Sequence, residues 1–158
     1  MKLTIQQCDR LANRIKNYVI TRTMTKNRDF MDEEFAKYSY KYAKLKGSPR
    51  VNLVLTGAML LDDFYVEVRP VGAVKTLKLG EKDIAGFEFQ DLLINYGFHS
   101  ELSKQKYIWN AFGHNVVRNG KNVGFAPPRD FLGAARNKAL MSSEELFKLI
   151  REVLKRKL

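Results

Sequence analysis

The chain has 158 residues, of which 28 are Lys or Arg and 17 are Asp or Glu, so its net charge at pH 7 is +11. Hydrophobic residues make up 45% of it, which excludes a wholly disordered chain and predicts one folded domain over residues 1–158. The single cysteine excludes an internal disulfide framework. The basic excess suits an acidic partner such as nucleic acid, an anionic membrane surface or an acidic protein face, although it also describes a self-repelling, soluble surface.

The ends and hydropathy of the sequence predict a product made in the cytoplasm. The first residues lack the continuous apolar core of a signal peptide. No stretch approaches the roughly 18 apolar residues of a membrane span. We therefore expect no membrane partner.

The first predicted element is an amphipathic helix over residues 3–22, followed by a polar loop over 21–28. Thr4 and Gln7 have the spacing of a capping box, in which each side chain bonds a free amide of the first turn. The apolar stripe recurs every three or four positions. It consists of Ile5, Cys8, Leu11, Ala12, Ile15, Tyr18 and Val19.

A second helix is predicted over residues 32–46. Acidic residues 32–34 stand where it would begin and Lys41, Lys44 and Lys46 where it would end, which complements the helix dipole. Gly47 and Pro49 would end it. Tyrosines at 38, 40 and 42 also alternate, so a strand remains the alternative there.

From residue 51 the pattern predicts short strands. Residues 51–55 form a short apolar run, residues 64–68 alternate, and 74–79 offer the returning strand of a hairpin. A further strand is predicted at 87–89. Residues 82–106 are otherwise polar.

The C-terminal half begins with a short helix over 104–112 that Gly113 stops. Residues 117–128 contain Asn119-Gly120 and two prolines, which predicts an exposed loop or a long hairpin tip. A closing helix follows Ser142, which has capping-box spacing with Glu145. Its apolar stripe is Leu146, Leu149, Ile150 and Val153. The fold class predicted is α+β, a small antiparallel β-sheet flanked by N-terminal and C-terminal helices.

Few residues offer catalytic or ligand-binding chemistry. Cys8 lies on the apolar stripe of the first helix, where a thiol is normally a core residue. His99 with Glu101 makes too few ligands for a metal, and Asp62 and Asp63 would face opposite ways on a strand. No glycine-rich phosphate loop occurs. The sequence therefore predicts a protein that is not an enzyme and binds no cofactor or metal.

Basic residues interleaved with tyrosines carry the main alternative function. Residues 37–42 and 104–107 could contact phosphates and stack on bases, as in a basic nucleic-acid-binding module. The simpler interpretation is a helix face on which tyrosines pack and lysines are solvated. No known nucleic-acid-binding signature accompanies the pattern.

Two stretches resemble a known family when taken in order. The first is residues 38–47, a segment ending in a basic run, followed at 51–60 by Val-Asn-Leu-Val-Leu-Thr-Gly-Ala-Met-Leu. The second is Trp-Asn-Ala-Phe-Gly at 109–113, then Pro-Pro-Arg-Asp-Phe-Leu-Gly at 127–133. Over residues 30–155 this order is similar to the virion morphogenesis proteins of tailed bacteriophages, called tail-completion, tail-terminator or head–tail joining proteins. Residues 82–106 are longer than the family pattern, which affects the expected strand count.

The resemblance implies a non-enzymatic ring in the virion, at the neck or the head-proximal end of the tail. The implied partners are further copies of the chain, six or alternatively twelve, together with tail-tube and head-connector proteins and, transiently, DNA in the channel. Phe131 and Leu132 would fill a pocket in their own subunit or in a neighbour. The candidate contact residues are Thr56, Gly57, Trp109, Phe112, Pro128, Arg129, Phe131 and Leu132.

Overall fold

The computed structural model describes residues 3–37, 39–40, 43–44, 58–70, 85–89, 92–134 and 138–155. The helical elements are α1 (Ile5–Ile20), the π-helical turns η1 (Thr21–Thr25) and η2 (Ala58–Asp63), α3 (Glu101–Phe112) and α4 (Ser143–Lys155). The strands are β1 (Phe64–Pro70), β2 (Ala85–Phe89), β3 (Leu92–Phe98), β4 (His114–Arg118) and β5 (Lys121–Ala126). The predicted α+β class, with antiparallel sheets and helices near both ends of the chain, is confirmed.

Helix α1 begins as the sequence predicts. The Thr4 amide donates to Gln7 Oε1 at 2.9 Å and the Gln7 amide donates to Thr4 Oγ1 at 3.2 Å, so the capping box is present. Ile5 is exposed and Tyr18 half-buried, whereas the rest of the predicted stripe is buried. These buried residues are Cys8, Leu11, Ala12, Ile15 and Val19.

The loop predicted from residue 21 is wrong for its first five residues. The helix continues through η1, and Arg22 and Thr23 are buried. Arg22 Nη1 donates to the Leu140 carbonyl at 2.9 Å and Nη2 to the Phe131 carbonyl at 2.7 Å. These carbonyls, which are distant in sequence, accept the hydrogen bonds of a buried charged side chain. The polar loop predicted at this position would instead leave Arg22 in solvent.

The helix predicted from residue 32 is also wrong in its first half. Asp32 has φ 62° and residues 33–37 are not helical. Asp29 Oδ1 accepts the amides of Met31 and Glu33 at 2.8 and 3.0 Å, so an aspartate turn takes the place of the first helical turn. Tyr40 is helical, which excludes the strand alternative at that position. The remainder, from 45 to 50, lies outside the described residues.

The main sheet has the strand order β1-β3-β2, with both pairs antiparallel. The predicted strands at 64–68 and 87–89 are confirmed as parts of β1 and β2. The central strand β3 was not predicted, because residues 82–106 look polar as a whole. Its run of apolar residues is almost entirely buried, which is typical of a strand covered on both faces. The strands predicted at 51–55 and 74–79 lie outside the described residues.

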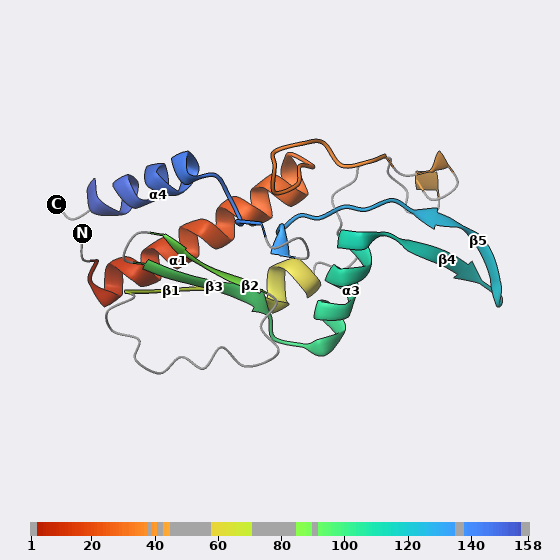
Figure 1. Ribbon diagram of the computed structural model, residues 1–158, viewed down its shortest axis with the longest axis horizontal. Helices are drawn as coiled ribbons and strands as arrows, with labels where there is room; N and C mark the ends of the chain where they lie inside the picture. The colour runs from red at the N-terminus through yellow and green to blue at the C-terminus, as the bar shows by residue number, and fades with distance from the viewer. Residues whose placement is uncertain are drawn as a thin grey trace.

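Helix α1 packs on β1, and α4 packs on α1 (Figure 1). All four predicted stripe residues of α4 are buried, and the Glu145 amide donates to Ser142 Oγ at 3.3 Å. Among the described residues, no helix is both long and apolar enough to cross a membrane.

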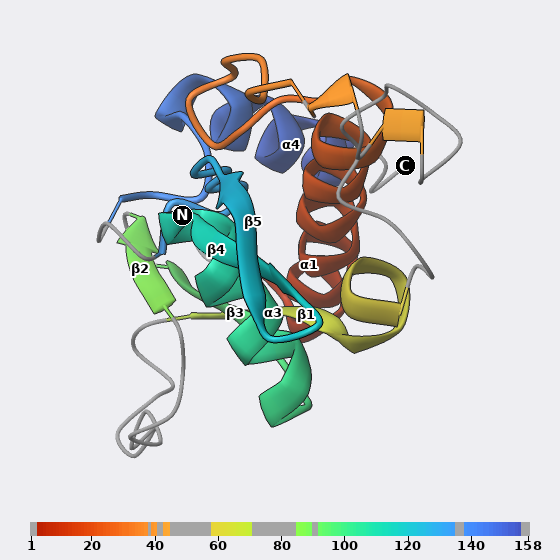
Figure 2. The ribbon, with the colours of Figure 1, turned by 90° about the vertical axis from the view of Figure 1, so that its right-hand side faces the viewer.

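The second sheet is the hairpin β4–β5, which confirms the hairpin alternative for residues 117–128. Asn119 and Gly120 have φ values of 49° and 72°, so both central turn residues adopt the left-handed conformation of a type I′ turn. The hairpin projects from one end of the molecule, and α4 lies at the other end (Figure 1, Figure 2).

Candidate interaction surface

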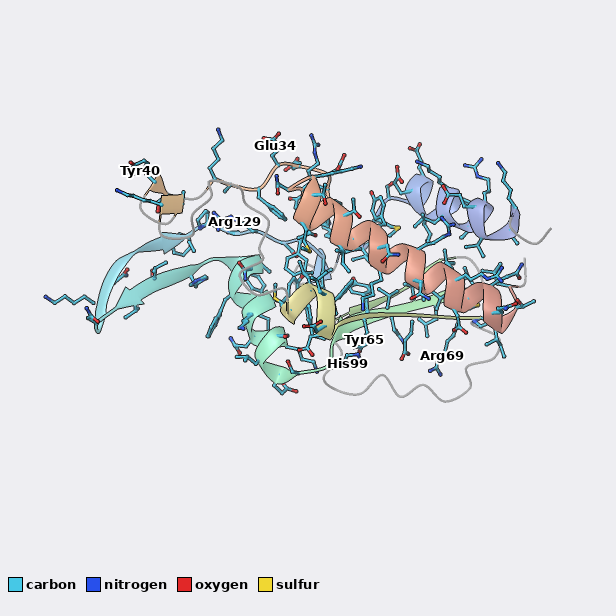
Figure 3. The ribbon with its side chains drawn as sticks, turned by 180° about the vertical axis from the view of Figure 1, so that it is seen from behind. Glu34, Tyr40, Tyr65, Arg69, His99 and Arg129 are labelled. Atoms are coloured by element: carbon cyan, nitrogen blue, oxygen red, sulfur yellow. The ribbon has the colours of Figure 1, made fainter. Side chains whose placement is uncertain are left out.

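The segment 127–134, which follows β5, ties the hairpin to the rest of the molecule through Arg129. The Arg129 amide donates to the Asn110 carbonyl of α3 at 2.6 Å. Its Nε donates to the Ala36 carbonyl at 2.8 Å and its Nη2 to the Lys37 carbonyl at 3.2 Å. Arg129 therefore lies between the base of the hairpin and the segment that leads to Tyr40 (Figure 3). Through its backbone amide and its buried guanidinium, Arg129 thus joins three segments that are remote in sequence.

The next two residues connect the same segment to the core. Asp130 Oδ1 accepts the Tyr107 hydroxyl at 2.7 Å and the Gly133 amide at 2.8 Å. The Phe131 ring meets the rings of Tyr107 and Phe98 edge-on, with centroids 5.0 and 6.4 Å apart. Segment 127–134 thus packs against α3 and β3 and accepts a hydrogen bond from Arg22 of η1. This packing fixes the direction in which the hairpin leaves the body.

Gly113 fixes the contact between α3 and the hairpin. Its φ is 77°, and a Cβ added there would lie 2.6 Å from the Ala126 carbonyl oxygen and 2.7 Å from the Phe125 ring. Glycine is therefore required both for the backbone conformation and for the close approach of β5. The Phe125 side chain is held at the base of the hairpin by this approach.

Large apolar side chains remain exposed on α3 and on the hairpin. Helix α3 turns Tyr107 and Ala111 into the core, which leaves its next positions on the outer face. Asn115, Val117 and Phe125 share one face of the hairpin, because Asn115 pairs with Phe125 and alternate residues of β4 point the same way. We call the following set, 41–61% exposed, the α3–hairpin surface: Ile108, Trp109, Phe112, Val117 and Phe125.

The candidate contact residues divide into three groups. Trp109, Phe112 and Pro128 are exposed, and the first two belong to the α3–hairpin surface. Arg129, Phe131 and Leu132 are buried in their own chain, at 5%, 0% and 0% exposure. This burial agrees with the first alternative for Phe131 and Leu132, a pocket in the same subunit. Thr56 and Gly57 lie outside the described residues.

Ile108, Val117 and Phe125 were not predicted as contact residues from the sequence. The signal for Ile108 was its place on the helical face that Trp109 and Phe112 share. The two hairpin residues fell in a segment interpreted as an exposed loop or tip. An apolar residue in such a segment is informative once the strand pairing is known.

The groups considered for catalysis are not assembled into a site in the described part of the chain. Cys8 is buried, and burial, followed by the charge of Asp9, raises the pKa of its thiol. Hydrogen bonds from Ser100 and then Ser103 lower the pKa of Asp63, the opposite of the effect of a shared proton. The described residues contain no cluster of three or more potential metal ligands.

The two histidines pack against aromatic rings. His99 stacks on Tyr65 with ring centroids 4.8 Å apart (Figure 3). His114 Nδ1 lies 3.2 Å from the Trp109 carbonyl oxygen, and its ring centroid lies 6.1 Å from that of Trp109. His114 therefore contacts both the backbone carbonyl and the ring of the exposed Trp109 where α3 joins β4.

Alkaline pH is expected to destabilise the fold through two buried acids, Cys8 and Tyr96, and the half-buried Tyr18. Burial raises the pKa of Cys8, Tyr18 and Tyr96 above the ordinary values of 9.0 for Cys and 10.0 for Tyr. The stability that their neutral forms contribute is fully present below these ordinary values and is lost as the pH rises through the higher folded-state values. Urea unfolding from about pH 8 to about pH 11 should show a falling free energy of unfolding. Tyr96→Phe should reduce that fall, and an unchanged pH profile would contradict the assignment.

Helix α4 carries an open groove of about 770 Å³. Phe147, Ile150 and Leu154 supply its apolar part, and Glu144 and Glu145 lie at the N-terminal end of the helix. Lys148 and Arg151 complete the lining. The groove thus combines the exposed parts of Phe147 and Leu154 with acidic residues at its N-terminal end and basic residues farther along the helix.

No protein-family model, curated protein or solved structure matches this chain.

Proposed function

We propose that this protein is a non-enzymatic structural component of a tailed-phage virion. In this proposal it forms a homo-oligomeric ring at the neck or the head-proximal end of the tail, where it completes the tail tube and joins it to the head connector. The sequence resemblance motivates the class. The observation that carries the proposal is the α3–hairpin surface, an apolar surface at the projecting end of a highly charged protein.

The exposed apolar side chains of this surface favour its association with a partner protein. Exposed apolar side chains that are grouped on neighbouring elements, and not scattered singly over the surface, generally mark sites of association. Aromatic residues such as Trp109 and Phe112 are also the types that contribute most to protein–protein interfaces. Segment 127–134 and Gly113 hold the surface on the core, so little conformational entropy is lost when a partner binds.

Purified protein incubated with tail tubes and viewed by electron microscopy tests the proposal. We expect rings or material at the tube ends. Phe112→Asp should lower tube-end occupancy about tenfold or more, because a charge would replace a side chain that the partner covers. Ile5→Asp is the control, since Ile5 is 79% exposed at the start of α1, an element that carries no residue of the α3–hairpin surface. Failure of the unaltered protein to engage tubes, or an equal effect of both variants, would count against the proposal.

A basic nucleic-acid-binding module is the second candidate function. The net charge of +11 together with the exposed Trp109 and Phe112 favours it, because bases can stack on aromatic rings beside phosphate-binding cations. The test is DNA affinity as a function of salt. A steep fall in affinity with rising salt, with no binding to tail tubes, would favour this candidate.

A further inference from the structure

The hairpin carries two exposed apolar side chains. Val117 is 60% exposed and Phe125 is 61% exposed, and the register places both on one face. Lys121, the first residue after the turn, is exposed at the tip. The hairpin therefore presents two exposed apolar side chains on one face, with a basic residue at the tip.

The groove on α4 has the complementary arrangement. Phe147 and Leu154 are partly exposed along the groove, and the acidic pair Glu144 and Glu145 lies at its N-terminal end. Lys148 and Arg151 line the groove as well, so only its N-terminal end is acidic. The lengths also agree. The six residues of β5 extend about 20 Å at roughly 3.3 Å per residue. The 13 residues of α4 also extend about 20 Å at roughly 1.5 Å per residue.

These two features cannot meet within one molecule. The hairpin and α4 lie at opposite ends of the long axis (Figure 1), and segment 127–134 fixes the hairpin in its outward direction. A second copy of the chain is therefore the natural occupant of the groove.

We propose that the hairpin of one copy lies in the α4 groove of the next copy, in a head-to-tail contact. Val117 and Phe125 would cover the exposed parts of Phe147 and Leu154, and Lys121 would lie near Glu144 and Glu145. A contact between two different surfaces is heterologous, and it generates a ring when the rotation between copies closes. The inference rests on the ring in the proposed function and specifies which surfaces build it.

The contact is small, and its size determines how it should be studied. One hairpin on one helix buries less than the roughly 800 Å² per partner of a standard stable interface. A single pair of copies is thus expected to dissociate readily, whereas closure of a ring makes the last contact intramolecular. Covalent trapping is therefore more informative than the mass of the free protein.

Cysteine trapping of the full chain tests the contact directly. Asn122 and Arg151 are exposed residues, the first on the hairpin and the second at the groove, so Asn122→Cys and Arg151→Cys leave the apolar contacts intact. Cys8 is buried, and the unaltered protein with a short bifunctional thiol reagent shows its background. The reaction is run over a range of protein concentrations, with and without tail tubes.

A head-to-tail contact makes three distinct predictions. The double variant should give a ladder of cross-linked oligomers that ends at the ring size. A mixture of the two single variants should give a dimer and nothing larger, and each single variant alone should give none. Self-linking of a single variant, which indicates a contact between like surfaces, or the absence of a ladder under every condition would overturn the inference.

Val117→Asp in the double-cysteine background provides the specificity control. We expect it to lower ladder formation about tenfold or more, whereas Leu102→Asp, an exposed apolar residue elsewhere, should not. Circular dichroism of both proteins verifies that they are folded. Rings at tube ends without a ladder would overturn the hairpin–groove contact but retain the proposed function. A ladder without tube binding would retain the contact and count against the function.

Discussion

Replacing Phe131 by Ala is expected to lower the free energy of unfolding by about 3–5 kcal/mol, the range found for removing a buried phenylalanine. Phe131 is fully buried, and its ring meets those of Tyr107 and Phe98. Those two rings belong to α3 and β3, so a cavity at this position would loosen both neighbours of segment 127–134. Relaxation is limited because the Arg129 and Asp130 hydrogen bonds hold the backbone on either side.

Chemical denaturation followed by circular dichroism measures this effect. Phe112→Ala is the matched control, because it removes the same side chain from a position that is 54% exposed. The control should change stability by about 0.5 kcal/mol or less. A loss of less than about 1 kcal/mol in Phe131→Ala would contradict its place at the centre of the core.

Replacing Arg22 by Ala is expected to cost about 2–4 kcal/mol, because it leaves the buried carbonyls of Phe131 and Leu140 without their donors, at about 1–3 kcal/mol each. The guanidinium also lies 5.5 Å from the centre of the Tyr18 ring, so a cation–π contact is lost. Removal of a charge from a buried site offsets part of the cost, since burial already lowers the pKa of Arg22.

Thermal and denaturant unfolding of Arg22→Ala should be compared with those of Arg10→Ala. Arg10 is exposed on the same helix and should change stability by about 0.5 kcal/mol or less. Arg22→Lys should recover only part of the loss, because an ammonium group cannot reach two carbonyls in the geometry of a planar guanidinium. Equal effects at positions 22 and 10 would show that water satisfies the two carbonyls.

Both variants bear on function because Phe131 and Arg22 support the segment that directs the hairpin. Phe131→Ala is therefore expected to weaken tube binding and cross-linking together, even though the residue is not in contact with a partner. Val117→Asp should reduce cross-linking without changing stability by more than about 0.5 kcal/mol. Stability measurements on each variant separate a lost contact from a misdirected hairpin.

Elements with a strong local pattern were determined by the sequence alone. The capping box and stripe of α1, the alternation of β1, the helix that ends at Gly113, the Asn119–Gly120 turn and the stripe of α4 all agree with the structure. Each depends on interactions within a few residues, so the pattern contains the necessary information.

Only the tertiary structure decided the features that depend on distant partners. The helix continues through Arg22 because carbonyls more than a hundred residues away accept its hydrogen bonds. The strand β3 is central because two strands remote from each other pair with it. Phe131 is buried because segment 127–134 packs against α3 and β3, whereas Phe125 is exposed because it lies on the projecting hairpin. The projecting apolar hairpin could not be read from the sequence, because its exposure is set by the buried contacts of Arg129 and Asp130.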